Sequence, residues 1–323
     1  MKIQLIHKYT DIINLENLLL AWQEFVVGKS RRKDVQIFSR NLMDNIVSLN
    51  QDLVNKTYQH GGYADFYIND PKRRHIHKAS VRDRLLHHAI YRILYPFFDR
   101  TFIGDSYSCR LDKGTHKAIN RFRRLAYQVS QNHTHTCWVL KCDIRKFFAS
   151  VDHNVLLDIL RKYIPDKDII SLLENVIQSF DYGLPLGNLT SQLFANVYMN
   201  KFDQFIRHKL KVKNYIRYAD DFVILSQDKQ WLEEQILQIK DFLETKLLLE
   251  LHPNKVSIET IASGVDFLGW KLFIDHRVLR TKTKKRMFAR IQQYPTKKDV
   301  LNSYLGLLSY GNEYKTVSKI SLF

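Results

Sequence analysis

Residues 215–225 read YIRYADDFVIL, a run of aromatic and β-branched residues that two adjacent carboxylates interrupt. The pattern predicts a strand, a tight turn and a second strand, with Asp220 and Asp221 at the tip of the hairpin. Adjacent carboxylates repel each other and resist desolvation, and a divalent cation would keep both ionised. We therefore expect a metal site at this tip. The alternative interpretation is a solvated turn, because aspartate is favoured in turns for its own backbone hydrogen bonds.

A second acid upstream favours the metal site. Residues 138–148 read WVLKCDIRKFF, in which an apolar strand again ends on an acid, Asp143. Asp143 and the Asp220 hairpin could together hold two Mg²⁺ ions about 4 Å apart, the arrangement that serves in-line phosphoryl transfer. The two acidic segments therefore predict nucleotidyl-transfer chemistry.

Composition indicates a folded chain with a polyanionic partner. Its 323 residues are enough for two or three structural units with a sizeable core. Lys and Arg outnumber Asp and Glu by 50 to 33, and the net charge of +17 is spread along the chain. Such an excess points to nucleic acid before a membrane surface, although general solubility would also account for it. The three cysteines are too few and too scattered for a disulfide framework or a zinc knuckle.

Neither a leader nor a membrane segment is expected. The first eight residues turn polar before an apolar core develops, and no uncharged apolar stretch approaches the ~20 residues that span a bilayer. We expect a cytoplasmic protein without membrane contact.

Hydrophobic periodicity predicts an α+β fold. Helical spacing occurs over residues 11–55, 81–100, 155–163, 169–177, 231–249 and 299–310, with further helices from Thr115 and after a cap at Asn188 or Thr190. Asp152 is the expected cap of the helix at 155–163. Strands are expected at 63–68, at 138–143, in the hairpin, and at 265–273 with a turn at Gly269. This order suggests a split β-α-β antiparallel sheet covered on one face by helices.

Basic segments are the candidates for nucleic-acid binding. A loop at 28–34 could grip a phosphate backbone, or could equally be a solvated connection, and a second basic run follows at 72–78. The segment from Arg277 is also strongly basic. Gly114 follows Arg110 and Lys113 and precedes the helix expected from Thr115, which makes this segment a candidate for a triphosphate pocket. The nucleic-acid-binding candidates are Arg31, Arg32, Lys33, Arg73, Arg74, Lys284 and Lys285.

Three motifs follow one another along the chain: Asp143, a glycine loop at 182–192 (YGLPLGNLTSQ) and YADD at 218–221. With these motifs in this order, the chain resembles a reverse transcriptase over nearly its whole length. More narrowly, it resembles the reverse transcriptases of diversity-generating retroelements, within the superfamily of group II intron-like enzymes. Most relatives carry Gln before the loop glycine and Ser-Pro after it, whereas this loop reads Leu186-Gly187-Asn188-Leu189. Residues 303–312, SYLGLLSYGN, look like that group's thumb helix.

The resemblance implies a right-hand polymerase fold. Its parts would be fingers at 1–136, a palm at 137–276 with a helical fingers insertion at about 154–183, and a basic helical thumb at 277–323. Template RNA, a cDNA primer and product, dNTPs and a small basic accessory protein are the implied partners.

The resemblance also implies roles for single residues. Asp143, Asp220 and Asp221 would be the catalytic carboxylates that hold two Mg²⁺ ions, for which Mn²⁺ is a possible substitute, with Ile144 beside them in the metal site. Lys255 could protonate the departing pyrophosphate, although a plain surface lysine fits as well. Phe148 falls at the position of the steric gate that selects deoxynucleotides. The implied dNTP-binding set is Arg82, Arg110, Phe148, Leu186, Gly187, Ser191 and Gln192, and the implied primer grip is Phe267, Leu268 and Gly269.

The expected function is that of an RNA-directed DNA polymerase that copies a template-repeat RNA into adenine-mutagenised cDNA, the chemistry of mutagenic retrohoming. A Gln at position 186 would hydrogen-bond near the nascent pair, whereas Leu186 offers only apolar contact, and we hypothesise looser nucleotide selection. Two alternatives stay open: a group II intron-like or defence-associated reverse transcriptase of ordinary fidelity, and a non-catalytic RNA-binding scaffold.

Overall fold

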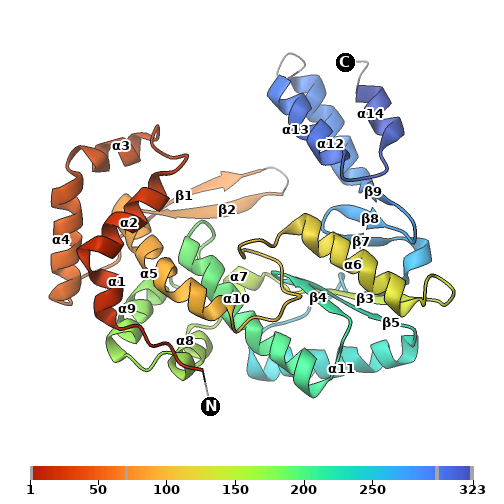
Figure 1. Ribbon diagram of the computed structural model, residues 1–323, viewed down its shortest axis with the longest axis horizontal. Coiled ribbons are helices and arrows are strands. Elements are labelled where there is room, and N and C mark those ends of the chain that lie inside the picture. The colour runs from red at the N-terminus through yellow and green to blue at the C-terminus, as the bar shows by residue number, and fades with distance from the viewer. Residues whose placement is uncertain (1–2, 70–71, 295–297, 321–323) are drawn as a thin grey trace. The chain divides into compact units, whose positions relative to one another are not determined.

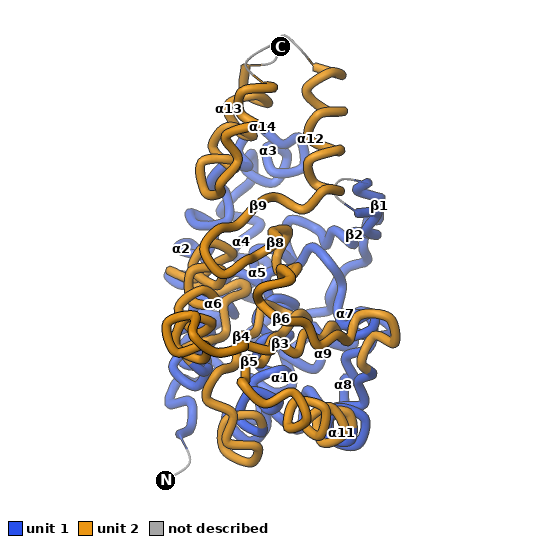
Figure 2. The backbone as a smooth tube through the Cα atoms, turned by 90° about the vertical axis from the view of Figure 1, so that its right-hand side faces the viewer, with its two compact units in different colours: residues 1–103, 144–205, 241–250 blue, residues 104–143, 206–240, 251–323 orange. Residues whose placement is uncertain are grey.

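The computed structural model describes residues 3–69, 72–294 and 298–320. The chain mixes helix and sheet and is 55% helical, which confirms the mixed α and β class. It folds into two compact units, and the chain passes between them several times (Figure 2). Unit 1 comprises residues 1–103, 144–205 and 241–250, and unit 2 comprises residues 104–143, 206–240 and 251–323. Of the expected thumb, residues 295–297 and 321–323 lie outside the described residues, and the division into fingers, palm and thumb stays a prediction.

Unit 1 is mainly helical (Figure 1). Polar caps begin several of its helices: Ser80, Asp152 and Asp166 each accept a hydrogen bond from a backbone N–H in the first turn, which confirms the expected cap at Asp152. Asn188 precedes α10 without a side-chain cap bond. The helices are α1 (Tyr9–Ile13), α2 (Leu15–Val26), α3 (Lys33–Arg40), α4 (Leu42–Val54), α5 (Val81–Asp99), α7 (Phe147–Ser150), α8 (His153–Tyr163), α9 (Lys167–Gln178) and α10 (Leu189–Gln204).

An antiparallel hairpin of β1 (Tyr63–Ile68) and β2 (Arg74–Ala79) completes unit 1. The strand β1 lies where the sequence predicts it. Most of the basic run at 72–78 forms β2, in which His75 pairs with Tyr67 and Lys78 with Ala64. Sequence reasoning missed β2 because its residues are polar and its strand conformation depends on pairing with β1.

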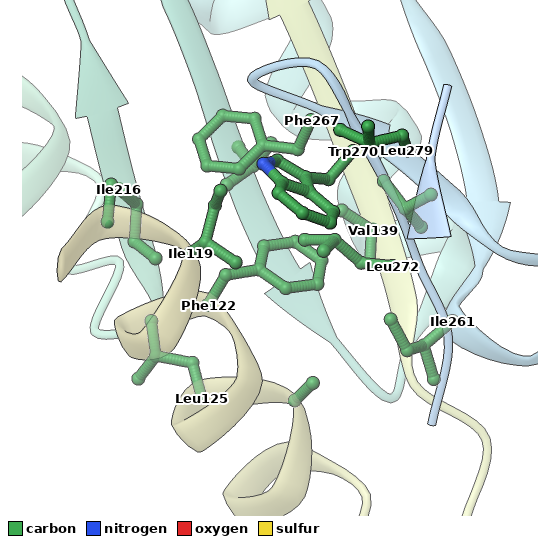
Figure 3. Packing of buried hydrophobic residues seen from close by; sticks show 14 of the residues in the cluster. Ile119, Phe122, Leu125, Val139, Ile216, Ile261, Phe267, Trp270, Leu272 and Leu279 are labelled. Atoms are coloured by element: carbon green, nitrogen blue, oxygen red, sulfur yellow. The ribbon is translucent and has the colours of Figure 1, made fainter. Parts of the chain in front are cut away.

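Unit 2 is built on a four-stranded sheet with the order β4-β5-β3-β6, antiparallel throughout. Its strands are β3 (Trp138–Asp143), β4 (Tyr215–Tyr218), β5 (Asp221–Ser226) and β6 (Ser257–Thr260). Helix α6 (Thr115–Val129) packs on β4 and β5 through Ile119, Phe122 and Leu125, where Val139 and Ile216 face it (Figure 3). Helix α11 (Lys229–Lys246) begins in unit 2, and its last turns belong to unit 1.

A second, three-stranded sheet extends the same core. It has the order β7-β8-β9, with β7 (Val265–Phe267), β8 (Trp270–Leu272) and β9 (Arg277–Leu279). Phe267 stacks on Phe122 of α6 with ring centroids 5.7 Å apart, and Trp270 lies beside them (Figure 3). Helices α12 (Thr281–Gln293), α13 (Lys298–Leu308) and α14 (Tyr314–Ile320) follow, and their apolar residues join this cluster.

A short irregular helix at Phe205–Lys209 and a short turn of helix at Ile261–Ser263 complete the chain. Within residues 3–69, 72–294 and 298–320, none of the helices combines the length and the apolar character that crossing a bilayer requires.

Candidate active site

The acidic hairpin is formed by β4 and β5. Tyr218 pairs with Asp221, so only Ala219 and Asp220 remain in the turn, and of the two acids predicted at the tip only Asp220 lies there. Ala219 has a φ of 56°, in the left-handed region that favours glycine. Asp220 is therefore displayed on a tight and strained turn, and Asp221 is the first residue of β5.

The other acid lies on the neighbouring strand. In the β3–β5 ladder, Asp143 is the direct partner of Asp221. Side chains of directly opposed residues point to the same face of an antiparallel pair. Asp143, Asp220 and Asp221 are thus gathered at one end of the sheet, inside unit 2.

The carboxyl group of Asp221 is kept from water. Its Oδ1 is buried and, among the described residues, meets no hydrogen-bond partner. Burial raises the pKa of Asp221 to about 7, against the opposing charge of Lys141, and the charges of Asp143 and Asp220 raise it further. Arg280 is a weaker opposing charge. A buried carboxylate oxygen without a donor is a group that a cation would satisfy.

Lys255 reaches the first acid. Its Nζ lies 2.8 Å from Oδ1 of Asp143. The His252 N–H donates to the Asp143 carbonyl at 2.8 Å, and the Lys255 N–H donates to the His252 carbonyl at 3.1 Å, so this turn is anchored at the end of β3. The Lys255 side chain is 43% exposed, which leaves its ammonium accessible from solvent.

The three aspartates suit Mg²⁺ only if other ligands complete its coordination shell. Carboxylate oxygens are the ligands that Mg²⁺ and Mn²⁺ prefer. In the described part of the chain, no three His, Cys, Asp or Glu side chains form a group that could enclose a metal by themselves. Mg²⁺ usually takes one or two carboxylates and completes its shell with water and substrate phosphates. The three aspartates therefore suit ions that a bound nucleotide helps to coordinate.

Unit 1 contains a separate basic pocket with a cavity of about 330 Å³. Its lining combines four cations with aromatic and apolar side chains, and Asp34 pairs with two of the cations, at 2.5 Å from Arg84 and 2.7 Å from Lys78. Though burial opposes it, hydrogen bonds from Lys78 and Arg84 hold the pKa of Asp34 at about 2. The lining residues are Phe25, Lys29, Arg32, Phe66, Ile76, Lys78, Arg84, His87, His88, Gly187, Leu189 and Gln192.

The charge of the basic pocket suits an anion. Burial lowers the pKa of Lys29, and the neighbouring Arg32 and Arg84 lower it further. Burial and the charges of Lys29 and Arg84 lower the pKa of His88 to about 4, so this ring is neutral at pH 7. A cluster of cations that disfavours additional positive charge would be stabilised by a phosphate.

Several predicted dNTP-binding residues lie in unit 1. Gly187 and Gln192 line the basic pocket, and Leu186 is half-buried beside them, with its carbonyl accepting from the His77 N–H at 2.8 Å. Ser191 is buried in α10. Arg82 is paired with Asp52 and lies over the Tyr58 ring.

Phe148 is half-buried in α7, and its neighbour Phe147 is fully buried, as a core residue should be. The Phe148 carbonyl accepts from the Leu184 N–H at 2.6 Å. Gly183 has a φ of 69°, and a Cβ atom there would meet the Phe148 carbonyl oxygen at 2.3 Å. The glycine loop therefore fixes the backbone of Phe148.

The remaining candidates are dispersed. Arg31, Lys33, Arg74 and Lys285 are exposed, and Arg73 lies over the Tyr67 ring at 4.3 Å. Lys284 is engaged with buried Glu313 at 2.9 Å. Ile144 is buried, and Arg110 donates to the Ser106 carbonyl. Phe267 is a core residue, and Leu268 and Gly269 form the turn between β7 and β8.

Sequence reasoning did not single out Lys141, Arg280 or Arg217, which surround the acids in unit 2, or Lys29 and Lys78 of the basic pocket. Lys141 stands two residues before Asp143, so strand alternation could have placed both on one face. Arg217 lies within residues 215–225, but the sequence pattern there predicts a charged side chain that faces solvent.

Comparison with known proteins places the chain among polymerases. The family described as reverse transcriptase (RNA-dependent DNA polymerase) matches residues 68–272. Protein YkfC of Escherichia coli (strain K12) is 25% identical over 77% of this chain and 75% of its own length. The group II intron-encoded protein LtrA of Lactococcus lactis subsp. cremoris is 24% identical over 75% of this chain and 51% of its own length. A putative COX1/OXI3 intron 2 protein of Saccharomyces cerevisiae is 20% identical over 89% of this chain and 43% of its own length.

Proposed function

Because the chain belongs to the reverse transcriptase (RNA-dependent DNA polymerase) family, we propose that Asp143, Asp220 and Asp221 carry out metal-dependent addition of deoxynucleotides to a primer paired with RNA. Its domain is that of an RNA-directed DNA polymerase. The observation that carries the residue assignment is the pairing of Asp143 with Asp221 across β3 and β5, next to the Asp220 turn. The chain spans about half the length of LtrA, so activity, substrates and partners of the whole protein are part of the proposal.

Each acid has its own task in this proposal. Asp143 and Asp220 would hold the metal ions, and Asp221, one of whose carboxylate oxygens is buried, would add negative charge to the site. Bound Mg²⁺ or Mn²⁺ would activate the primer 3′-hydroxyl and neutralise the triphosphate. Lys255, whose ammonium contacts Asp143, holds the proton that the leaving pyrophosphate accepts. Phe148 acts as the gate against a 2′-hydroxyl.

The basic pocket of unit 1 supports a nucleic-acid substrate. It offers cations for a phosphate and the exposed ring of Phe66 for a base. We assign the template strand to this pocket and to the exposed cations Arg31, Lys33, Arg73 and Arg74 of the same unit, and the exposed Lys285 of unit 2 stays a separate candidate for nucleic-acid binding.

Primer extension on poly(rA)/oligo(dT) tests the activity. We expect DNA synthesis in Mg²⁺, and loss of at least about 1,000-fold on Asp220→Ala, because removing a metal carboxylate removes transition-state charge stabilisation. Asp241→Ala, a change of the same kind at an exposed position of α11, is the matched control. A folded wild-type protein that bound RNA but extended no primer would favour the non-catalytic scaffold.

We further propose that the polymerase is of the diversity-generating type and misincorporates opposite template adenines, acting with a small basic accessory protein. Support comes from Leu186, whose apolar side chain replaces a hydrogen-bonding Gln in the loop beside the basic pocket. Leu186→Gln should lower the error frequency at adenines several-fold, as measured by sequencing the cDNA. Unchanged errors at adenines would remove this explanation, and a low wild-type error rate would favour a group II intron-like enzyme of ordinary fidelity.

A further inference from the structure

Arg217 is a buried cation directly beneath the acidic turn. It is the third residue of β4 and pairs with Phe222 of β5, one step before the pair Tyr218–Asp221 that closes the hairpin. Its side chain is fully buried, with a relative exposure of 0%. Placing a guanidinium in the interior costs free energy unless its donors are satisfied, so its contacts indicate why it is there.

Two of these contacts join the turn to a neighbouring loop. Arg217 Nη1 donates to the carbonyl oxygen of Ala219 at 3.0 Å. Its Nη2 donates to the Ser106 hydroxyl, also at 3.0 Å. The loop itself is attached to β4 by backbone bonds, since the Arg217 N–H donates to the Asp105 carbonyl and the Tyr107 N–H donates to the Arg217 carbonyl.

The loop is firmly held in turn. The Asp105 carboxylate accepts from Arg121 at 2.8 and 3.2 Å and from Arg207 at 2.9 Å. Its side chain is only 9% exposed. Ser106, to which Arg217 is bonded, is fully buried. Arg217 therefore couples the turn to an anchored part of unit 2.

The hydrogen bond from Arg217 to the Ala219 carbonyl constrains the orientation of the peptide group between Ala219 and Asp220. In a two-residue hairpin, types I′ and II′ differ mainly in the orientation of this central peptide, which can rotate with little movement of the flanking strands. Ala219 already occupies a left-handed conformation that costs about 1 kcal/mol for a residue with a Cβ. A charged donor on the Ala219 carbonyl selects one orientation and thereby fixes the direction in which Asp220 leaves the turn.

We propose that Arg217 is a positioning residue for Asp220, which keeps the second metal-binding carboxylate aligned with Asp143. The inference rests on the proposed function, in which these acids bind a divalent cation. It differs from that function in naming the element that pre-organises the metal site, because Arg217 is fully buried and acts on Asp220 through the Ala219 carbonyl.

Binding of Mn²⁺ to the protein without nucleic acid, followed by electron paramagnetic resonance, tests the proposal. Arg217→Met should weaken Mn²⁺ binding about tenfold, the effect of losing one charge-assisted hydrogen bond. The matched control is Arg207→Met, which loses bonds to Asp105 and to the carbonyls of Val212 and Lys213 but no bond to the turn. This control should lower the melting temperature and leave Mn²⁺ affinity within about twofold of wild type.

If Arg217→Met does not fold, Arg217→Lys tests the positioning role instead. A lysine keeps the buried positive charge but cannot donate to the Ala219 carbonyl and the Ser106 hydroxyl with the fixed geometry of a guanidinium. We expect about threefold weaker Mn²⁺ binding and, in primer extension, a lower kcat with an unchanged KM for dNTP. Wild-type Mn²⁺ affinity in a folded Arg217 variant would overturn the positioning role. Absence of Mn²⁺ binding by the wild type itself, matched by Asp220→Ala, would instead overturn the metal site.

Discussion

At the scale of single residues, Asp221 is the acid with the most unusual environment. Asp143 is balanced by the ammonium of Lys255, whereas Asp221 is buried and faces two other carboxylates besides the opposing charge of Lys141, and its Oδ1 meets no donor among the described residues. Its ionisation in the metal-free protein therefore opposes folding. Carboxyl groups with a raised pKa are common at functional sites, because a bound cation makes the ionised carboxylate favourable where it was unfavourable before.

Asp221→Asn should stabilise the metal-free protein at pH 8 and have a clearly smaller effect at pH 5. The pKa of Asp221 is raised from 3.8 to about 7 in the folded state, so its favourable contribution is complete below pH 3.8 and is lost as the pH rises through 7. Removing the charge should regain on the order of 3 kcal/mol at pH 8. Urea unfolding with EDTA at both pH values measures this, and equal effects at pH 5 and pH 8 would contradict the raised pKa.

At the scale of elements, the glycine loop at 182–192 connects two predicted parts of the dNTP site within unit 1. Leu184 hydrogen-bonds to the carbonyl of Phe148, and Leu186 hydrogen-bonds to His77 of β2. A change in the conformation of this loop would therefore move the backbone of Phe148, the proposed gate residue, and of β2, the strand that lines the basic pocket.

Gly183→Ala should disrupt this connection. The new Cβ would lie 2.3 Å from the Phe148 carbonyl oxygen, and the φ of 69° is itself unfavourable for alanine. We expect a loss of about 3 kcal/mol or more in stability, and weaker discrimination between dNTP and NTP in whatever folded protein remains. Thermal unfolding and single-nucleotide extension measure the two effects.

Gly62→Ala is the control for this change, because it introduces the same side chain where nothing lies within 4 Å. It should leave both stability and sugar selection close to wild type. Equal behaviour of the two variants would mean that Gly183 is not a packing constraint.

Some of the strands could be predicted from the sequence, and others could not. The hairpin at 215–225 and the strand ending on Asp143 were predictable, because acids that interrupt β-branched runs leave few other interpretations. The strands β2, β6 and β9 were missed, since they are short or polar and exist only through their partners. The pairing of Asp143 with Asp221 and the burial of Arg217 are long-range properties that no local pattern encodes.

At the scale of the whole molecule, the net charge of +17 favours a polyanionic partner such as nucleic acid. Some of the 50 Lys and Arg residues pair with acids, as in the Arg82–Asp52 and Lys284–Glu313 pairs, whereas the basic pocket keeps an excess of cations. Association with nucleic acid should therefore depend strongly on salt.

Binding of a single-stranded RNA should weaken about 100-fold between 50 and 200 mM salt if about five phosphates are neutralised. The double change Lys29→Glu and Arg32→Glu should weaken binding and flatten the salt dependence, because both cations line the basic pocket. Fluorescence anisotropy with a labelled oligonucleotide measures both quantities.

Lys162→Glu with Lys167→Glu makes the same change of charge on exposed residues outside the basic pocket. It should have a clearly smaller effect. An equal loss in both double variants would assign binding to overall charge and not to the pocket.

The ladder between β3 and β5 also limits how the gene can change in length. Deleting one residue inside either strand would turn every later side chain to the opposite face, so Asp143 would no longer share a face with its partner Asp221. The loop at 131–136, which precedes β3, can gain residues without shifting that alignment. Peptide tags or reporter insertions should therefore be tolerated there and abolish polymerisation when placed a few positions later.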